Sequence, residues 1–397
     1  MSELLAPAGN LEKLETVYRY GADAAYIGIK NFSLRKKADN FFDDEYRQMA
    51  ALKGDRKLYG ALNIYFHNSE LAVLDENIDY IRAYPLDGFI ISDMGLVDRL
   101  QKHFPDRNLH LSTQANCINK DAARFYHRLG FSRIVLGRET SLDEIKAIKD
   151  AVPELELEVF VHGAMCLAYS GRCFLSRYMA GRSANSGDCA HSCRWDYRYL
   201  EEKERPGELF PVEAEEHYTA VLSSKDLCLL HDLKTLKEAG IDSFKIEGRM
   251  KSIYYAAIVT RAYRKTLDAL DGIPVPDLEA YQNEIEKVSH REFTRGFFFD
   301  DGDPDKTSDL SYIRRYRLLG KVGEPTGDGR FALKLYNRLD AGDTIEYISP
   351  HFPYKKETGW ILTDEEGRSL ETAGHGRTVF IRSSCPISPG DILRKEE

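Results

Sequence analysis

Five of the seven cysteines lie between residues 166 and 228, close enough in the chain to share one site. Four of them, Cys166, Cys173, Cys189 and Cys193, follow the spacing C-x6-C-x15-C-x3-C, and Cys228 comes later. Cysteines that only pack in a core are not bunched in this way. Thiolates held close together repel one another unless a metal neutralises them, so the cluster predicts a metal or iron-sulfur site.

Zinc is the main alternative to iron at these thiols. The chain begins MSELLAPAGN, without the basic flank of a secretory signal, and has no apolar run of membrane-spanning length. We therefore expect a cytoplasmic protein with reduced thiols, which argues against disulfides. Structural zinc sites usually have short C-x2-C or C-x4-C pairs, whereas these long gaps suit a cluster with ligands from separate loops. Radical enzymes that use S-adenosylmethionine need a cysteine where this chain has Asp196.

The first 250 residues alternate between short β-branched runs and amphipathic helical patterns, which predicts an α/β fold with a parallel sheet. The strand candidates are 3–7, 24–29, 58–66, 88–92, 109–113, 133–137, 157–163 and 242–248. Eight such units favour a (β/α) barrel of the triosephosphate-isomerase type. No Gly-x-Gly-x-x-Gly follows the first strand, which argues against a dinucleotide-binding sheet.

The chain of 397 residues is long enough for one large and one small domain. We expect the barrel domain at 1–297, with an insertion at 164–226 where a loop of a few residues is usual. Loops of this type gather on the carboxyl-terminal face of a barrel, where its active sites lie, so the cysteines should lie there. An acidic linker is expected at 298–309, and glycine-separated short strands predict a small antiparallel β-barrel domain at 310–397.

Polar residues at the carboxyl ends of the predicted strands are candidates for the site, although such residues often only cap helices. They are Asn63, Asp93, Gln114, Asn116, Arg138, Glu139, His162, Glu247 and Arg249. In the last strand, alternation turns Lys245 and Glu247 into the barrel, either as an ion pair or as part of the substrate site. His162 precedes Cys166 by four residues, but a cysteine-histidine protease needs one activated thiol, and this segment has five.

The net charge of -9 argues against a protein that coats nucleic acid nonspecifically, but it leaves room for a local basic surface. From residue 310 onward, fourteen Lys and Arg face thirteen Asp and Glu, so this part carries +1 and the rest -10. Its basic residues begin with Arg314, Arg315, Arg317 and Lys321, mixed with tyrosines. This pattern suits either an RNA contact or a solvated strand edge.

The cysteine segment resembles the signature of the collagenase-like peptidase family U32, Glu-x-Phe-x-x-Gly-(Ser or Ala)-x-Cys-x-x-x-x-Gly-x-Cys-x-x-Ser. The matching residues are Glu158, Phe160, Gly163, Ala164, Cys166, Gly171, Cys173 and Ser176. The segments ELLAPAGN, STQAN, CAHSCRW, SSKDLC and KIEGRMK are also similar to family segments. The resemblance therefore spans residues 1 to about 300, and the region after 310 is similar to a β domain that some members carry.

The resemblance implies RNA hydroxylation with a 4Fe-4S cluster, despite the peptidase name. Members with this domain order are similar to proteins that form 5-hydroxyuridine at the wobble position of tRNA, a step linked to prephenate. A cysteine-dependent or metal-dependent peptidase, and a non-catalytic RNA-binding module, are the alternatives. The oligomeric state stays open.

The resemblance also implies roles for the cysteines. Cys166, Cys173 and Cys189 would be cluster ligands, with Cys228 as the fourth and Cys193 as its rival. If prephenate or another dicarboxylate binds, the expected cations are Arg138, Lys245 and Arg249, with Gln114 and Asn116 as hydrogen-bond donors. Cys117 and Cys385 match no ligand motif, and we expect them to be ordinary buried thiols.

Overall fold

The computed structural model describes residues 2–29, 32, 45–166, 168–195, 199–201, 209–211, 225–299 and 312–397. Contacts within the chain define two compact units. The barrel unit comprises Met1–Tyr18, Ala22–Lys251 and His290–Tyr312, and the C-terminal unit comprises Arg19–Gly21, Ser252–Ser289 and Ile313–Glu397.

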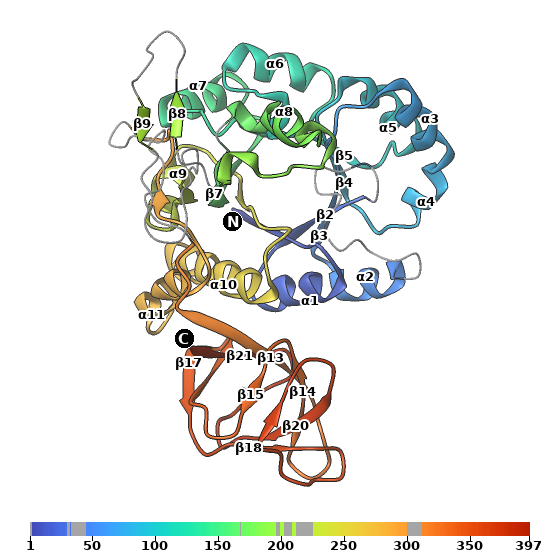
Figure 1. The fold of residues 1–397 in the computed structure, drawn as a ribbon. Coiled ribbons are helices and arrows are strands. Elements are labelled where there is room, and N and C mark those ends of the chain that lie inside the picture. The colour runs from blue at the N-terminus through green and yellow to red at the C-terminus, as the bar shows by residue number, and fades with distance from the viewer. Residues whose placement is uncertain are drawn as a thin grey trace. The chain divides into compact units, whose positions relative to one another are not determined.

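The barrel unit contains a closed ring of eight parallel strands, as the sequence predicts (Figure 1). They are β1 (Glu3–Pro7), β2 (Ala24–Gly28), β3 (Lys57–Leu62), β4 (Gly88–Ile91), β5 (Asn108–Leu111), β6 (Arg133–Val135), β7 (Glu156–Ala164) and β11 (Ser243–Ile246). Consecutive strands pair in parallel, and β11 closes the ring because it pairs with both β1 and β7. The strands are buried runs rich in Leu, Ile and Val, as expected for strands covered on both faces.

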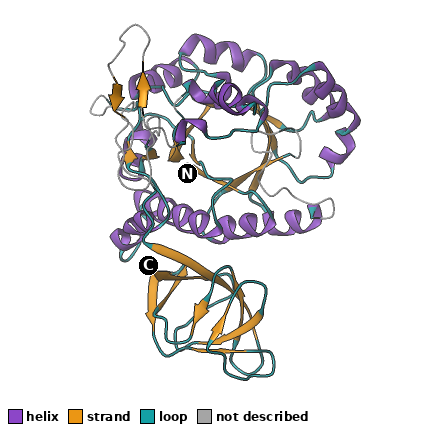
Figure 2. Ribbon diagram, viewed as in Figure 1, coloured by secondary structure: helices purple, strands orange, loops and turns teal. Residues whose placement is uncertain are grey.

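Helices surround the strands (Figure 2). They are α1 (Leu11–Arg19), α2 (Tyr46–Lys53), α3 (Asn68–Glu76), α4 (Ile78–Arg82), α5 (Val97–His103), α6 (Lys120–Arg128), α7 (Leu142–Ala151) and α9 (Leu233–Glu238). Local sequence sets several of their starts. Ser141 and Glu144 form a capping box at α7, and the Asn119 side chain accepts hydrogen bonds from two backbone N–H groups at α6.

The expected insertion after β7 has short, irregular elements in its described parts. They are η3 (Tyr169–Gly171), α8 (Leu175–Ala180), η4 (Ala184–Ser186), η5 (Ser192–Arg194), β8 (Tyr199–Glu201) and β9 (Leu209–Pro211). The chain then rejoins the sheet through β10 (Asp226–Cys228), which runs antiparallel to β7 and also pairs with β12 (Phe293–Thr294). The insertion therefore starts and ends beside β7.

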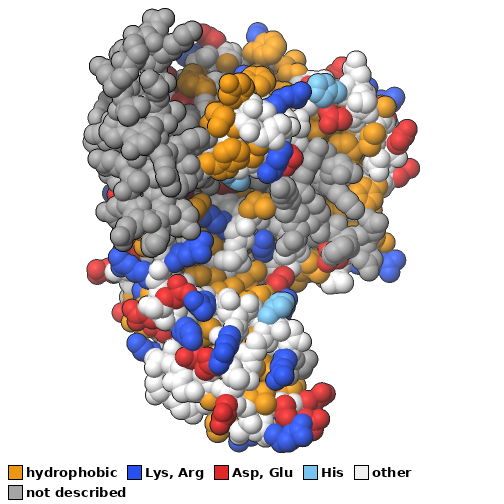
Figure 3. Space-filling view, in the orientation of Figure 1, with side chains coloured by type: hydrophobic (Ala, Val, Ile, Leu, Met, Phe, Trp, Pro, Cys, Tyr) orange, Lys and Arg blue, Asp and Glu red, His pale blue; other side chains and the backbone are white. Residues whose placement is uncertain are grey.

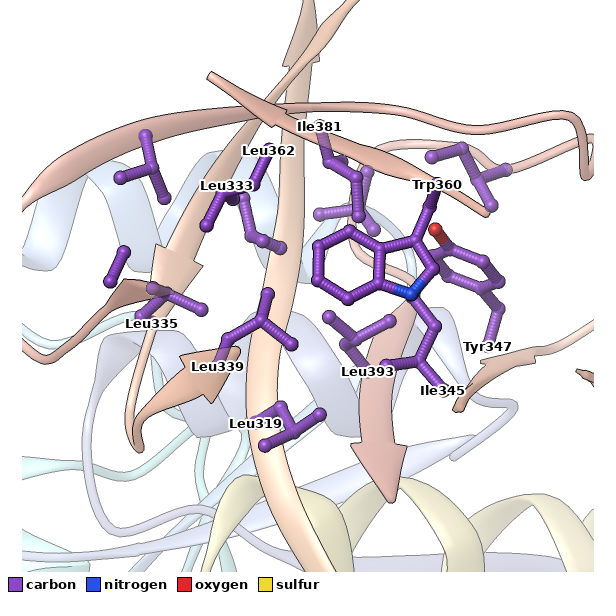
Figure 4. Close-up of a cluster of buried hydrophobic side chains, with 14 residues drawn as sticks. Leu319, Leu333, Leu335, Leu339, Ile345, Tyr347, Trp360, Leu362, Ile381 and Leu393 are labelled. Carbon is purple, nitrogen blue, oxygen red and sulfur yellow. The ribbon is translucent and has the colours of Figure 1, made fainter. Parts of the chain in front are cut away.

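The C-terminal unit contains a curled antiparallel sheet of seven strands, which confirms the expected small β domain. The sheet comprises β13 (Tyr316–Pro325), β14 (Phe331–Leu335), β16 (Ile345–Ser349), β17 (Phe352–Glu357), β18 (Ile361–Thr363), β20 (Thr378–Arg382) and β21 (Ile392–Glu396), and β15 (Leu339–Asp340) pairs with β19 (Thr372–Ala373). Leu319, Tyr347 and Trp360 belong to its apolar core (Figure 4). The Trp360 indole N–H donates to the Asp343 carbonyl at 2.9 Å, so the buried ring has a polar partner.

Two helices, α10 (Ile253–Leu270) and α11 (Leu278–Asn283), followed by η7 (Glu284–Lys287), belong to the C-terminal unit by their contacts. The barrel domain expected at 1–297 includes this segment, whereas the contacts group Ser252–Ser289 with the C-terminal unit. Most of the predicted linker at 298–309 lies outside the described residues. Among the helices that the structure describes, none has the length and apolar character needed to cross a membrane.

Candidate functional site at the barrel rim

A buried charge network lies near the amino ends of the barrel strands. The Arg133 guanidinium contacts the carboxylates of Glu3 at 2.5 Å and Glu158 at 3.1 Å. Lys245 Nζ lies 2.7 Å from the other oxygen of Glu158. Among the described residues, the Lys245 ion pair is therefore with Glu158 rather than with Glu247, and the second alternative, a place in the substrate site, stays a prediction for Lys245 and Glu247. Glu158 is fully buried, so its charge is tolerated because two cations neutralise it.

Two rings, those of Tyr59 and His110, lie in the same layer of the barrel interior as this charge network. The Tyr59 hydroxyl donates to Glu3 Oε2 at 2.9 Å, and the Tyr59 ring packs against His110 with 4.5 Å between ring centroids. Burial holds the pKa of His110 well below its usual value, and the charges of Arg133 and Lys245 add to that effect. His110 is therefore a neutral core residue at physiological pH.

Above this layer, two aromatic rings bring the three predicted cations together. Lys245 Nζ lies 4.7 Å from the Tyr26 ring centroid and 5.3 Å from that of Phe160. The Arg138 guanidinium lies over Phe160 at 4.1 Å, and that of Arg249 lies 5.7 Å from the Tyr26 centroid. Arg138, Lys245 and Arg249 thus border one region at the carboxyl ends of β2, β7 and β11, where barrel active sites form.

Glu247 and Gln114 face the same rim. Glu247 Oε2 accepts a hydrogen bond from the Tyr26 hydroxyl at 3.2 Å. Gln114 is buried in the 3-10 turn η2 (Thr113–Ala115), and its Oε1 has no hydrogen-bond partner within the described ranges. Asn116 adopts a left-handed backbone conformation, and its buried Oδ1 also has no partner there. Buried polar atoms without partners are rare in folded proteins, so these two are candidates for ligand contacts.

The turn that follows the first cysteine is tied to the strand ends by two of the predicted polar residues, Glu139 and Gln114. Both Glu139 oxygens accept hydrogen bonds from Ser170, one from its backbone N–H and one at 2.7 Å from its hydroxyl. A side chain at Gly171 would meet Gln114 Nε2 at 3.1 Å and Cys166 Sγ at 3.8 Å, and this residue has a φ of +79°. Glycine at 171 therefore allows the turn and leaves room between Cys166 and Gln114.

The segment around Cys189 is fixed by Ser176 and Arg182. The Ser176 hydroxyl donates to the Arg182 carbonyl at 2.7 Å and accepts from the Ala190 N–H at 2.8 Å. The Arg182 guanidinium donates to the Cys189 carbonyl at 3.1 Å. These bonds hold the segment from Arg182 to Ala190 against α8.

Cys228 enters the same rim from a different strand. It lies opposite His162 in the antiparallel pairing of β10 with β7, at the level where β11 ends. Burial lowers the pKa of His162 to about 3, and its ring packs against Phe293 with 5.5 Å between centroids. A general base works best with a pKa near the working pH, so His162 is poorly suited to activate a thiol.

The thiols fit an iron-sulfur cluster by their chemistry. All seven cysteines are free, Cys166 is exposed, and Cys173, Cys189, Cys193 and Cys228 are half-buried. In the parts of the chain that the structure describes, no three His, Cys, Asp or Glu side chains converge on a point where one metal ion would fit. In a four-iron cluster, each cysteine ligand would bind its own iron.

The remaining candidates have structural roles or remain predictions. Asp93 caps the turn after β4, because its carboxylate accepts from the Phe66 and Gly95 N–H groups. The backbone carbonyl of Asn63 accepts a hydrogen bond from the Ser92 hydroxyl. Cys117 is fully buried, and burial raises its pKa to about 12, as expected for an inert thiol. Cys385 is half-buried against the C-terminal core, so it is less buried than expected.

The basic residues that begin the small domain lie on and before β13. Arg314 and Arg315 are exposed, whereas Arg317 pairs with Glu397 at 2.6 Å. Strand β13 pairs with β14 on one side and with β21 on the other. The alternative interpretation of this strand as a sheet edge is therefore wrong, since a strand paired on both sides needs no charges to block aggregation.

The fold and the rim together define a class: a (β/α) barrel with a cysteine-rich insertion beside β7 and an appended antiparallel β domain. Comparison with known proteins agrees with this description. Residues 9–308 match Peptidase family U32, and residues 314–394 match the Peptidase family U32 C-terminal domain. The chain belongs to Peptidase family U32.

Proteins similar to this chain carry two kinds of name. "tRNA hydroxylation protein P1" of Bacillus subtilis is 37% identical over 406 residues, covering 99% of this chain and 94% of that protein. "tRNA hydroxylation protein P" of Escherichia coli is 34% identical, covering 98% of this chain and 92% of that protein. "Collagenase" of Porphyromonas gingivalis is 31% identical, covering 98% and 97%.

Proposed function

We propose that this protein acts in the hydroxylation of tRNA. The observation that carries the proposal is the full-length similarity to two tRNA hydroxylation proteins, at 37% and 34% identity. The product that we propose is 5-hydroxyuridine at the wobble position. The cysteine-rich insertion supports an enzymatic role, because it lies on the face of the barrel where loops supply active sites.

The proposed cofactor is a 4Fe-4S cluster held by Cys166, Cys173 and Cys189, with Cys228 or Cys193 as the fourth ligand. When bound, such a cluster supplies one-electron transfer at a potential that the surrounding residues tune. The chain's own part is to position the ligands. Glu139 fixes the turn that follows Cys166 through Ser170, and Arg182 holds the Cys189 backbone.

The proposed co-substrate is a small dicarboxylate such as prephenate. Arg138 and Arg249 border the region between Tyr26 and Phe160, and guanidinium groups bind carboxylates with two parallel hydrogen bonds. Lys245 would act mainly as a buried charge, since it already pairs with Glu158. The Gln114 and Asn116 amides lie at the same rim, and each could donate a hydrogen bond to the ligand.

Anaerobic purification tests the cofactor. The protein should be brown and contain about four irons and four sulfides per chain. Cys193→Ser and Cys228→Ser, made separately, decide the fourth ligand, because only loss of the true ligand should reduce the iron content. Cys117→Ser and Cys385→Ser are matched controls outside the motif. Stoichiometric zinc without labile sulfide would exclude the cluster.

The peptidase alternative rests on the relative named Collagenase. Against it stands His162, whose pKa of about 3 leaves it neutral but weakly basic at pH 7. Cleavage of gelatin that stops on cysteine alkylation, with unchanged tRNA nucleosides in a strain lacking the gene, would establish the peptidase. Binding of tRNA with unchanged nucleosides would point to a non-catalytic RNA-binding module.

The start of the small domain is a proposed contact for the tRNA backbone. Arg314 and Arg315 are exposed, and Lys321 is half-buried in β13. Residues 1–309 carry a net charge of -10, which repels RNA, so the substrate needs a second surface to hold it while one base enters the site.

A further inference from the structure

The insertion that carries the cysteines exposes five large apolar side chains within 27 residues. Their exposed fractions are 52% for Tyr169, 76% for Phe174, 85% for Tyr178, and 38% for both Met179 and Trp195. Seven other large apolar residues of the described chain are exposed, and they are scattered over the remaining sequence. Figure 3 shows apolar side chains gathered with basic ones on the face that carries α8. Exposed apolar patches of this kind usually mark a binding surface.

The backbone beneath these side chains is held in place. Helix α8 is anchored through Ser176, whose hydroxyl bonds to the Arg182 carbonyl and the Ala190 N–H. Phe174 precedes the helix, and Tyr178 lies two residues beyond Ser176, so their rings project from an anchored segment rather than from a free loop. A surface presented in this way loses little conformational entropy when it binds.

The charge of the segment shows which partner it suits. Residues 168–193 contain three arginines and one aspartate, although the whole chain carries -9. Arg182 pairs with that aspartate, Asp188, at 2.8 Å, whereas Arg177 is exposed on α8 beside Tyr178. Aromatic rings interleaved with arginine are the surface on which unpaired bases stack and phosphates are held.

We propose that the exposed side chains of Phe174, Arg177 and Tyr178, which lie three and four residues apart at α8 and so share one face, form a stacking platform for the unpaired bases of an RNA loop. This inference rests on the proposed function, and it assigns the substrate contact to the cysteine-rich insertion itself. Since Phe174 follows Cys173 directly, a base next to the platform would lie beside the proposed cluster. A base that is already unpaired costs least to turn into the site.

The test compares the affinity of the purified protein for a fluorescent tRNA anticodon stem-loop, measured by anisotropy. Phe174→Ala combined with Tyr178→Ala should weaken binding at least about tenfold, because stacking on one aromatic ring contributes about 1–3 kcal/mol per base. The matched control is Phe125→Ala on α6, which removes a ring that is 50% exposed in the same unit. Its affinity should change less than about twofold.

Several outcomes would separate this inference from the proposed function. If the wild-type protein does not bind tRNA, both fail. If it binds tRNA and the double variant binds equally well, the platform is overturned while tRNA hydroxylation stands. If the double variant loses its circular dichroism spectrum or its iron, Tyr178→Ala decides alone, since a side chain 85% exposed has little packing to lose. Tyr178→Phe should retain wild-type affinity, and a loss there would mean that the hydroxyl, not stacking, matters.

Discussion

The buried ion pair between Glu158 and Lys245 gives a quantitative prediction for Glu158→Gln. Glu158 is fully buried and neutralises Lys245 at 2.7 Å and Arg133 at 3.1 Å. Glutamine keeps the shape but removes the charge, so Lys245 loses its carboxylate, while Arg133 keeps Glu3 at 2.5 Å. Breaking one buried pair in this way costs about 3–5 kcal/mol, and we expect the lower end of this range because Arg133 retains a partner.

Urea denaturation followed by circular dichroism at 222 nm measures this loss. The control is Asp79→Asn, which removes an exposed pair with Arg82 and should cost less than about 1 kcal/mol. Adding Lys245→Met to Glu158→Gln should restore much of the stability, since no unpaired charge is then buried. A Glu158→Gln variant as stable as Asp79→Asn, or a double variant no better than the single one, would refute the reasoning.

Three further predictions concern pH, the cysteine turn and RNA. The pKa of His110 is lower in the folded than in the unfolded state. Its neutral ring therefore contributes stability that is present above about pH 6.5 and is lost as the pH falls. His110→Phe should reduce the slope of unfolding free energy against pH by about 1.4 kcal/mol per pH unit below pH 6. Gly171→Ala should cost about 1–2 kcal/mol, because alanine is strained at a φ of +79°, and should lower the iron content; iron equal to wild type would count against the proposed ligand role of Cys166. Replacing Arg314, Arg315 and Arg317 with glutamine should weaken tRNA binding and leave the iron content unchanged. The slope of log affinity against log salt concentration should become shallower by about one for each lost phosphate contact. An unaltered slope would mean that the RNA binds elsewhere.

The sequence predicts the barrel well because each strand and each helix is recognised from residues that are neighbours in the chain. Each strand of a barrel is a short apolar run followed by a helix, and the eight candidate runs coincide with β1 to β7 and β11. The cysteines also stand out locally, since four lie within 28 residues. The insertion is recognisable for a related reason: residues 164–226 are too many for an ordinary loop.

The pairings across the barrel are not readable in the same way. Lys245 and Glu158 lie 87 residues apart, and only the register of β11 against β7 sets Lys245 opposite Phe160 and beside Glu158. The contribution of Arg133 was missed because it lies at the amino end of its strand, away from the expected rim. A charge inside a strand otherwise made of apolar residues, as in Arg133-Ile134-Val135, is the signal that would have found it.

Strand order explains the error over β13. An edge strand and a central strand with one exposed face have the same sequence pattern, because in each of them charged residues and tyrosines alternate with buried residues. The order β21-β13-β14 comes from contacts with residues far along the chain, such as Leu318 with Arg394. Local patterns contain no information about it.

The cysteine-rich rim is proposed to serve a tRNA hydroxylation reaction. The most direct test of this proposal is mass spectrometry of tRNA nucleosides from a strain that lacks the gene and carries either the wild-type chain, Cys173→Ser or Cys385→Ser. We predict that 5-hydroxyuridine is absent from the deletion strain, returns with wild type and Cys385→Ser, and stays absent with Cys173→Ser. Unchanged 5-hydroxyuridine in the deletion strain, or full restoration by Cys173→Ser, would contradict the account.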